Sequence, residues 1–216
     1  MKIAIDIDNT IVDYRYLIIY YLSKYNKEFL IKNKINKNLS VNNIKETIKI
    51  CLGDDFWQKI QSYIYSSKEN VFFYEGAEDA IESLADLGYE LHFVSHKSKY
   101  GLLSSENVNI REIASERIIN WFYENNLKKF VTSICFCESF EEKLRMLNYL
   151  DPKIIIDDLV KIHLFFIENL NDIENKHFLF FNGSSENNKL LKNNFSKKII
   201  ELNTWSSITK YVEKLI

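Results

Sequence analysis

The chain has 216 residues, of which 46% are hydrophobic and 14% aromatic, and its formal net charge is -2. This balance excludes the strongly basic composition of proteins that bind nucleic-acid polymers or anionic membranes, and the aromatic content excludes a disordered chain. No apolar run reaches the roughly 18 residues that predict a transmembrane helix, and no signal-peptide pattern precedes the first strand. We therefore expect a soluble cytoplasmic protein with one domain, or one domain carrying an insert.

The three cysteines form neither a disulfide framework nor a metal-binding pattern. Cys51 stands alone, whereas Cys135 and Cys137 lie two residues apart in SICFC, without CxxC spacing. An odd count without this spacing fits a reducing compartment. We interpret Cys135 and Cys137 as core residues on one face of a strand.

The first predicted elements are a buried strand, KIAID (2–6), and an amphipathic helix with Asp13 as its N-cap. The apolar residues of this helix recur at helical spacing, and they are Tyr14, Leu17, Ile18, Tyr21, Leu22 and Tyr25. A Lys/Asn-rich stretch, 32–43, indicates a solvated loop. Two further helical patterns follow near 41–52 and 54–66.

The rest of the chain alternates between helices and strands. Gly76 opens a helix that Gly88 ends as a C-cap residue. The other expected helices are 110–125, 141–150 and one capped by Thr204. The expected strands are 90–94, 133–137, 153–157, 177–182 and 197–202. This alternation predicts an α/β fold: a Rossmann-like parallel sheet with helices on both faces.

Polar side chains follow three of the predicted strands. Asp6 and Asp8 end the first strand in IAIDIDNTIV, Ser95 follows the strand at 90–94, and Asp157 and Asp158 end the strand KIIID. Because the carboxyl ends of parallel strands meet at one edge of the sheet, these residues are expected to converge. Taken alone, Asp6 and Asp8 are also compatible with an Asx turn and a helix cap.

Four carboxylates around one point repel one another unless a cation joins them. Oxygen ligands without a nearby His or Cys favour magnesium, Mg²⁺. Lys143 lies on the helix before the last of these strands and is expected to pair with the anions, while the Ser95 hydroxyl and the amides of His96 and Lys97 are expected to hold a phosphate. Carboxylates, a magnesium ion, a lysine and a hydroxyl group together predict phosphoryl transfer to a carboxylate.

The segments DIDNT, FVSHK, Lys143 and IIIDD, in this order, resemble the four motifs of the haloacid dehalogenase (HAD) superfamily of phosphatases. YEGAEDAIESLADLGYELHFVS also resembles the approach to the second motif, so the resemblance covers residues 1–12 and 72–160. It implies a core of residues 1–12 and 74–216 with a small helical cap inserted at 13–73. The acid at position 8 resembles the phosphatases and not the dehalogenases.

The resemblance implies a role for each residue of the first two motifs. Asp6 would be the nucleophile that forms an aspartyl-phosphate. Asp8 would protonate the leaving alcohol and then activate water as a general base. Thr10 would stabilise the turn, and Ser95 would bind the phosphoryl group.

The resemblance also implies the charge-compensating residues. Lys143 would offset charge on Asp6 and the phosphate, with Lys128 and Lys129 as alternatives for this motif. Asp6, Asp158 and the backbone carbonyl of Asp8 would coordinate Mg²⁺. Asp157 would lie in a second shell or bind the ion through water.

The expected insert holds 10 basic and 6 acidic residues, so it carries +4 and the rest of the chain -6. A basic lid over an anionic substrate and ordinary solvated helix faces both account for this excess. Arg15, His96 and Lys97 are candidate substrate contacts. Trp57 and Tyr100 are weaker candidates, because aromatic side chains at such positions are usually core.

We predict a magnesium-dependent phosphatase of a small soluble phosphomonoester (a sugar, polyol or amino-alcohol phosphate), with no polymeric nucleic acid or membrane as partner. The insert position and the DD motif also resemble the 5'(3')-deoxyribonucleotidase branch, so nucleoside monophosphates are the rival substrates. A non-catalytic phosphate-binding or signalling domain is a further alternative. The order of the motifs and their intact residues argue against it.

Overall fold

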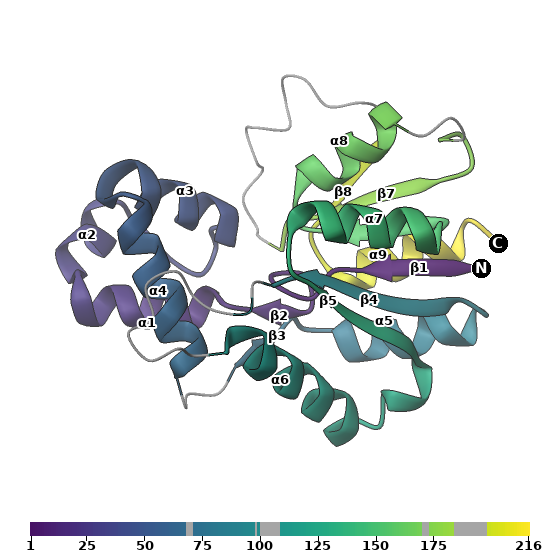
Figure 1. Ribbon diagram of the computed structural model, residues 1–216, viewed down its shortest axis with the longest axis horizontal. Helices are drawn as coiled ribbons and strands as arrows, with labels where there is room; N and C mark the ends of the chain where they lie inside the picture. The colour runs from purple at the N-terminus through teal and green to yellow at the C-terminus, as the bar shows by residue number, and fades with distance from the viewer. Residues whose placement is uncertain (68–70, 98, 100–108, 170–172, 184–197) are drawn as a thin grey trace.

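Figure 1 shows the computed structural model, which describes residues 1–67, 71–97, 99, 109–169, 173–183 and 198–216. A six-stranded sheet lies beside a separate group of helices. The strands of this sheet are β1 (Lys2–Ile5), β4 (Glu90–His96), β5 (Val131–Cys137), β6 (Ile154–Asp157), β7 (His177–Phe181) and β8 (Ile199–Leu202). All neighbouring strands pair in parallel. The predicted α/β class is therefore confirmed.

The strand order β5-β4-β1-β6-β7-β8 places β1 between β4 and β6. Ile5 at the end of β1 pairs with Phe93 on one side and with Ile156 on the other. The residues that follow these three positions are therefore neighbours at one edge of the sheet. The predicted convergence of the strand ends depends on this arrangement.

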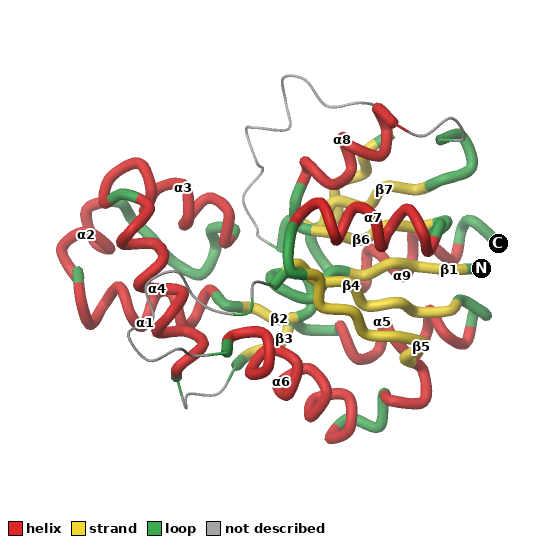
Figure 2. The backbone as a smooth tube through the Cα atoms, viewed as in Figure 1, coloured by secondary structure: helices red, strands yellow, loops and turns green. Residues whose placement is uncertain are grey.

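Helices cover both faces of the sheet (Figure 2). On one face lie α7 (Phe140–Leu150) and α8 (Val160–Asn169), which pack on alternate strand residues such as Ala4 and Ile155. On the other face lie α5 (Ala77–Asp86), α6 (Ile110–Glu124) and α9 (Trp205–Glu213), which pack against Ile3 and Ile5. The sequence pattern did not predict α8, because VKIHLFFIEN is apolar nearly all round and shows no single apolar face.

A second group of helices, here called the helical lobe, follows the first motif. It contains α1 (Arg15–Tyr25), α2 (Lys27–Lys32), α3 (Val41–Leu52) and α4 (Asp54–Ser66). The chain enters and leaves the lobe through two short antiparallel strands, β2 (Val12–Asp13) and β3 (Phe72–Phe73), which the sequence pattern did not predict. Such a pair brings the two ends of a long insertion together at the sheet.

Two details of the lobe differ from the expectation. The N-cap of α1 is Tyr14 and not Asp13, although the Asp13 carboxylate accepts the Arg15 backbone N–H at 3.0 Å and so still satisfies one helix donor. The short helix α2 occupies residues before the expected loop. Ser40 caps α3 through the Asn43 N–H at 3.2 Å.

Two expectations from the composition concern the cysteines and possible membrane-spanning helices. All three cysteines are free, and the Sγ atoms of Cys135 and Cys137 lie 3.9 Å apart on β5, with Cys137 buried. Within the described part of the chain, no helix combines the length and apolarity needed to cross a membrane.

Candidate active site

The carboxyl ends of β1, β4 and β6 meet at the edge of the sheet that faces the helical lobe (Figure 2). Asp6 follows β1 directly, and its backbone N–H donates to the Ile156 carbonyl of β6 at 2.9 Å. Ser95 lies on β4, and Asp157 is the last residue of β6. Residues about 150 positions apart in the chain thus share one site, as the parallel topology requires.

Lys143 reaches this edge from α7. Its Nζ lies 2.5 Å from Asp6 Oδ1 and 2.7 Å from Asp157 Oδ2, and the side chain is almost fully buried. Thr10 Oγ1 donates to the other Asp6 oxygen at 3.2 Å. Lys128 and Lys129, the alternatives for the third motif, lie on a short 3₁₀ helix (Lys128–Phe130) before β5, at the opposite end of that strand. Lys143 is therefore the lysine that meets the aspartates.

Three carboxylates form a group that fits a cation. Asp6, Asp157 and Asp158 each offer an oxygen, these oxygens lie within 4.8 Å of one another, and all three residues are buried. Asp157 already uses both oxygens, one on Lys143 and one on the Leu159 N–H at 2.8 Å. Oxygen-only donors of this kind suit Mg²⁺.

Burial and charge repulsion perturb this group. Burial, together with the nearby Asp157 and Asp8 carboxylates, raises the pKa of Asp6 to about 7 against the lowering effect of Lys143. Burial, together with Asp6 and Asp157, also raises the pKa of Asp158. Burial lowers the pKa of Lys143, but Asp157 and Asp6 outweigh it and raise the pKa above its ordinary value. One lysine thus leaves excess negative charge, which a divalent cation would offset.

Asp8 contacts a different set of residues. Its Oδ2 forms an ion pair with Lys97 and accepts a hydrogen bond from the Tyr65 hydroxyl of α4 at 3.4 Å. Lys97 also donates to that hydroxyl. Asp8 Oδ1 is buried and has no hydrogen-bond partner within the described ranges. One oxygen is therefore held in place while the other is free to face a substrate.

Ser95 and His96 differ sharply although they are adjacent. Ser95 is 1% exposed, and its Oγ has no partner among the residues that the structure describes, which leaves a buried hydroxyl available to a ligand. The His96 side chain, in contrast, is exposed. Burial, Lys143 and Lys97 lower the pKa of His96.

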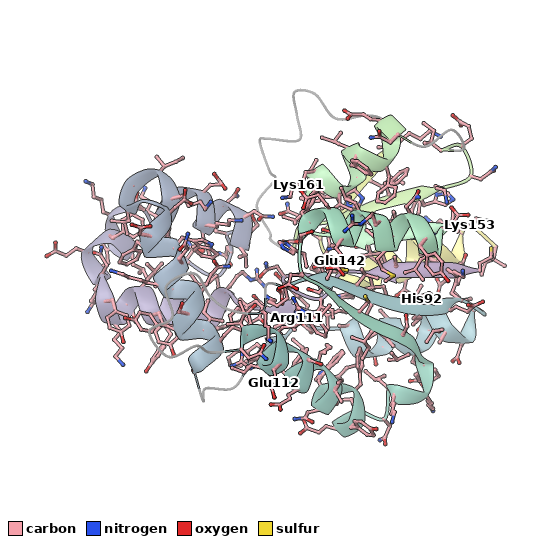
Figure 3. The ribbon with its side chains drawn as sticks, in the orientation of Figure 1. His92, Arg111, Glu112, Glu142, Lys153 and Lys161 are labelled. Atoms are coloured by element: carbon pink, nitrogen blue, oxygen red, sulfur yellow. The ribbon has the colours of Figure 1, made fainter. Side chains whose placement is uncertain are left out.

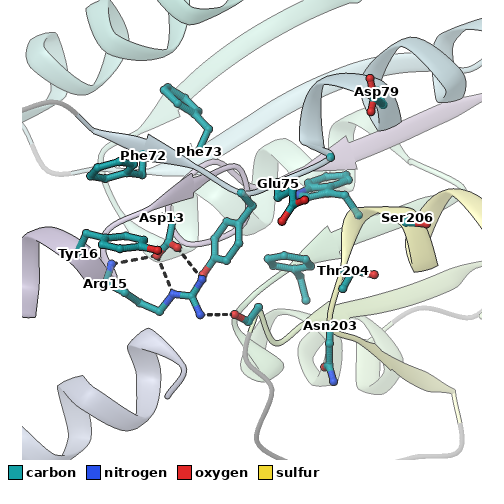
Figure 4. A pocket seen from close by; sticks show the side chains of 15 residues that line it. Asp13, Arg15, Tyr16, Phe72, Phe73, Glu75, Asp79, Asn203, Thr204 and Ser206 are labelled. Carbon is teal, nitrogen blue, oxygen red and sulfur yellow. Dashed lines mark hydrogen bonds and ion pairs between the residues drawn. The ribbon is translucent and has the colours of Figure 1, made fainter. Parts of the chain in front are cut away.

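The Arg15 guanidinium forms an ion pair with Asp13, its partner among the acidic residues that the structure describes. Figure 4 shows its guanidinium against Asp13, with distances of 2.8 and 2.6 Å to the two carboxylate oxygens. The same group donates to the carbonyls of Lys37 at 2.9 Å and Gly183 at 2.6 Å. It lines a separate cavity of about 750 Å³ beside β3 and the start of α9. Arg15 therefore joins three segments where the lobe meets the sheet.

Charged side chains surround the edge that faces the lobe. In Figure 3, Arg111, Glu142 and Lys161 lie near this edge, whereas Lys153 lies toward the opposite one. Arg111 Nε donates to the Lys97 carbonyl at 3.0 Å. This bond fixes the backbone that carries the lysine paired with Asp8.

The helical lobe supplies residues that the motif pattern could not identify. Asn42 on α3 donates to the Asp158 carbonyl at 2.9 Å, and Tyr65 contacts Asp8 and Lys97. A cavity of about 60 Å³ lies under the lobe, and Trp57, Tyr65 and Lys97 are among its lining residues. Tyr100, the other aromatic candidate, lies outside the described residues.

Comparisons with known proteins found likenesses in structure alone. No protein-family model and no curated protein matched the sequence. A haloacid dehalogenase-like hydrolase from Xanthomonas campestris has a TM-score of 0.55 and 10% identity, over 100% of this chain and 95% of that one. A HAD family hydrolase from Deinococcus radiodurans, solved with bound phosphate and sodium, has the same TM-score of 0.55 and 10% identity, over 99% and 95% of the two chains.

A third similar structure is CbbY from Rhodobacter sphaeroides, solved in complex with xylulose-1,5-bisphosphate. Its TM-score is 0.52 at 10% identity, over 95% of this chain and 94% of that one. These similarities extend over nearly the whole chain, so the fold is that of the HAD-superfamily hydrolases. The resemblance expected from the four motifs is therefore confirmed at the level of the fold.

Proposed function

We propose that this chain is a magnesium-dependent phosphatase that hydrolyses a small phosphomonoester through an aspartyl-phosphate on Asp6. One observation carries the proposal: Asp6, Lys143, Asp157 and Ser95 come from separate elements and meet in one buried site. A HAD-type hydrolase fold supports it. Residues 1–12 and 74–216 would form the core, and the insert 13–73 would act as the cap over the site.

Mg²⁺ would be held by Asp6 and Asp158, with the backbone carbonyl of Asp8 as a further ligand. Among the described residues, the Asp158 carboxylate has one weak side-chain contact, with Asn42 at 3.4 Å, whereas Lys143 and Leu159 engage both oxygens of Asp157. Asp157 therefore suits a supporting position. The ion would supply charge neutralisation at the transferring phosphoryl group.

The chain's own residues would carry out two displacements. An oxygen of Asp6 forms a bond to phosphorus while the bond from phosphorus to the leaving oxygen breaks and Asp8 gives that oxygen a proton. A water molecule then attacks the phosphorus, Asp8 takes its proton, and the bond to Asp6 breaks to release phosphate. The free Oδ1 of Asp8 would make both proton transfers.

Other residues would hold the reacting groups. The Ser95 hydroxyl, buried and unpartnered within the described ranges, would donate to a phosphoryl oxygen. Lys143 Nζ, 2.5 Å from Asp6, would keep the nucleophile ionised and offset charge on the phosphoryl group. Thr10 would orient the carboxylate through its hydrogen bond.

The first test of this function is metal dependence. Turnover of a panel of phosphomonoesters should require Mg²⁺, be lost on chelation, and return when Mg²⁺ is added back. Phosphate release measured with and without EDTA decides this. Full activity in excess EDTA would rule out the site as described.

Asp8→Asn should slow turnover without removing the nucleophile. Loss of general acid–base catalysis typically costs on the order of a hundredfold to ten-thousandfold in rate. The loss should be large for alkyl phosphates, whose leaving alcohol needs a proton, and small in the first step for acetyl phosphate, whose leaving group does not. Burst kinetics on both substrates measure the difference; an equal loss in that first step would show that Asp8 does not protonate the leaving group.

The rival readings make different predictions. A nucleotidase would prefer deoxynucleoside monophosphates to every sugar, polyol and amino-alcohol phosphate. A non-catalytic domain would be labelled by acetyl phosphate without turning it over. A cytoplasmic location stays a prediction from the sequence.

A further inference from the structure

The helical lobe is closed over the aspartates by hydrogen bonds from two of its helices. Asn42 on α3 donates to the Asp158 carbonyl, and Tyr65 on α4 donates to Asp8. Arg117 on α6 holds the end of α4, because its guanidinium donates to the carbonyls of Ile64 at 3.2 Å and Ser67 at 3.1 Å. The lobe is therefore held against the site, and the space between them has the size that it has with the lobe closed.

This space, here called the leaving-group cavity, is small. Its polar and aromatic lining residues are Asp8, Asn9, Tyr14, Trp57, Gln61, Tyr65 and Lys97, and aliphatic side chains of the lobe complete the wall. The cavity measures about 60 Å³. A water-sized group needs roughly 10–15 Å³ of cavity volume. The cavity therefore holds roughly four to six non-hydrogen atoms. That matches a two- or three-carbon polyol and is too small to enclose a hexose or a nucleoside.

The charges of the cavity are already balanced. Lys97, 7% exposed, is paired with the Asp8 carboxylate, so the two charged residues that line the cavity neutralise each other until Asp8 takes up the proton that it gives to the leaving oxygen. A leaving group with its own carboxylate or ammonium would add an uncompensated charge in a buried place, which is costly. The cavity therefore favours an uncharged leaving group.

Two residues that line this cavity each have an acceptor oxygen without a donor in the part of the chain that the structure describes. Asp8 Oδ1 and Asn9 Oδ1 are buried, and neither has a partner within the described ranges. Asn9 is fixed in a left-handed conformation with φ of 63°, and its N–H donates to the Val12 carbonyl at 2.8 Å. A buried acceptor left unpaired costs roughly 1–3 kcal/mol. Hydroxyl groups on the leaving group would satisfy such acceptors.

We propose that the leaving-group cavity selects a short uncharged polyol, so that the substrate is a phosphate monoester of a two- or three-carbon polyol such as glycerol. The proposal rests on the phosphatase function proposed above and narrows its substrate. Trp57 on α4 limits the size of the cavity, because its large, 7%-exposed side chain forms part of the wall. A hydroxyl group of the polyol donates to Asn9 Oδ1, and the free oxygen of Asp8 remains available for the proton transfers.

The test compares kcat/KM of the full chain, at saturating Mg²⁺, across esters of graded size and charge. The series is glycerol phosphate, ethanolamine phosphate, phosphoglycerate, a hexose phosphate and a deoxynucleoside monophosphate. Glycerol phosphate should exceed each of the others at least tenfold, equivalent to about 1.4 kcal/mol in transition-state binding. Acetyl phosphate has a small activated leaving group whose departure depends little on the cavity. Its turnover therefore measures phosphoryl transfer separately from leaving-group selection.

Two variants test the role of Trp57. Trp57→Ala should raise kcat/KM for the hexose phosphate relative to glycerol phosphate by about tenfold or more, since it removes a wall of the cavity. Ile50→Ala, at an 81% exposed position on α3, is the matched control and should leave this ratio unchanged. Trp57→Phe, which removes less volume, should shift the ratio in the same direction and serves if Trp57→Ala does not fold.

The outcomes separate the two proposals. If the wild-type chain prefers a nucleotide, a hexose phosphate or a charged ester, the polyol proposal is overturned, while magnesium-dependent turnover of acetyl phosphate would leave the phosphatase function standing. An unchanged substrate ratio in both Trp57 variants would also overturn it. If neither acetyl phosphate nor any ester is turned over, the function and the polyol proposal fail together.

Discussion

Asp6→Asn should reduce turnover by roughly a millionfold, the scale seen when a hydrolase loses its nucleophile, and so to below detection. The amide cannot form the aspartyl-phosphate, so no phospho-enzyme should accumulate on acid quenching. The fold should survive, because asparagine has the same shape and the change removes one of three crowded carboxylates. Lys143 keeps its ion pair with Asp157.

Three measurements decide this prediction. Intact-protein mass spectrometry after acid quenching detects the phosphoryl group, phosphate release reports turnover, and thermal unfolding reports the fold. Asp86→Asn is the matched control, because Asp86 is exposed at the end of α5, away from the strand ends that carry the site. Near-native turnover in Asp6→Asn would show that catalysis does not pass through this carboxylate.

The parallel sheet and the strand ends were predictable because each depends on local pattern. Short apolar runs such as KIIID predict buried strands, and the helices between them have clear apolar faces. Once the strands are parallel, topology brings Asp6 and Asp157 to one edge, where Lys143 meets both. The motif residues that the structure brings together are those fixed by the sheet.

The lobe residues were not predictable in the same way. Tyr65 lies on an amphipathic helix where its apolar neighbours indicate core packing, and only the folded arrangement shows its hydroxyl against Asp8. Asn42 likewise looks like an ordinary polar residue in the first turn of α3. Arg15 was a candidate substrate contact because it lies one helical turn from the first motif, and the sequence pattern did not show that its guanidinium forms an ion pair with Asp13. Contacts between distant elements carry no local signal.

Lys143→Met should both inactivate the enzyme and destabilise it in the absence of Mg²⁺. Methionine fills a similar volume but leaves Asp6 and Asp157 buried without their cation. Breaking a buried ion pair on one side typically costs about 3–5 kcal/mol in the free energy of unfolding. Denaturant unfolding in EDTA measures this cost, and added Mg²⁺ should recover part of it by occupying the same carboxylates.

The loss in Lys143→Met should depend on pH with a defined sign. The pKa of Asp6 is raised from 3.8 to about 7 even with Lys143 present, so the folded state binds more protons than the unfolded state. Stability without metal should therefore fall as pH rises from about 4 through 7, and the fall should continue to higher pH in the variant, whose Asp6 lacks the lowering effect of the lysine. Lys129→Met, at an exposed position before β5, is the matched control and should change neither activity nor this slope. Normal stability and turnover in Lys143→Met would mean that the buried lysine neither supports the fold nor serves the nucleophile.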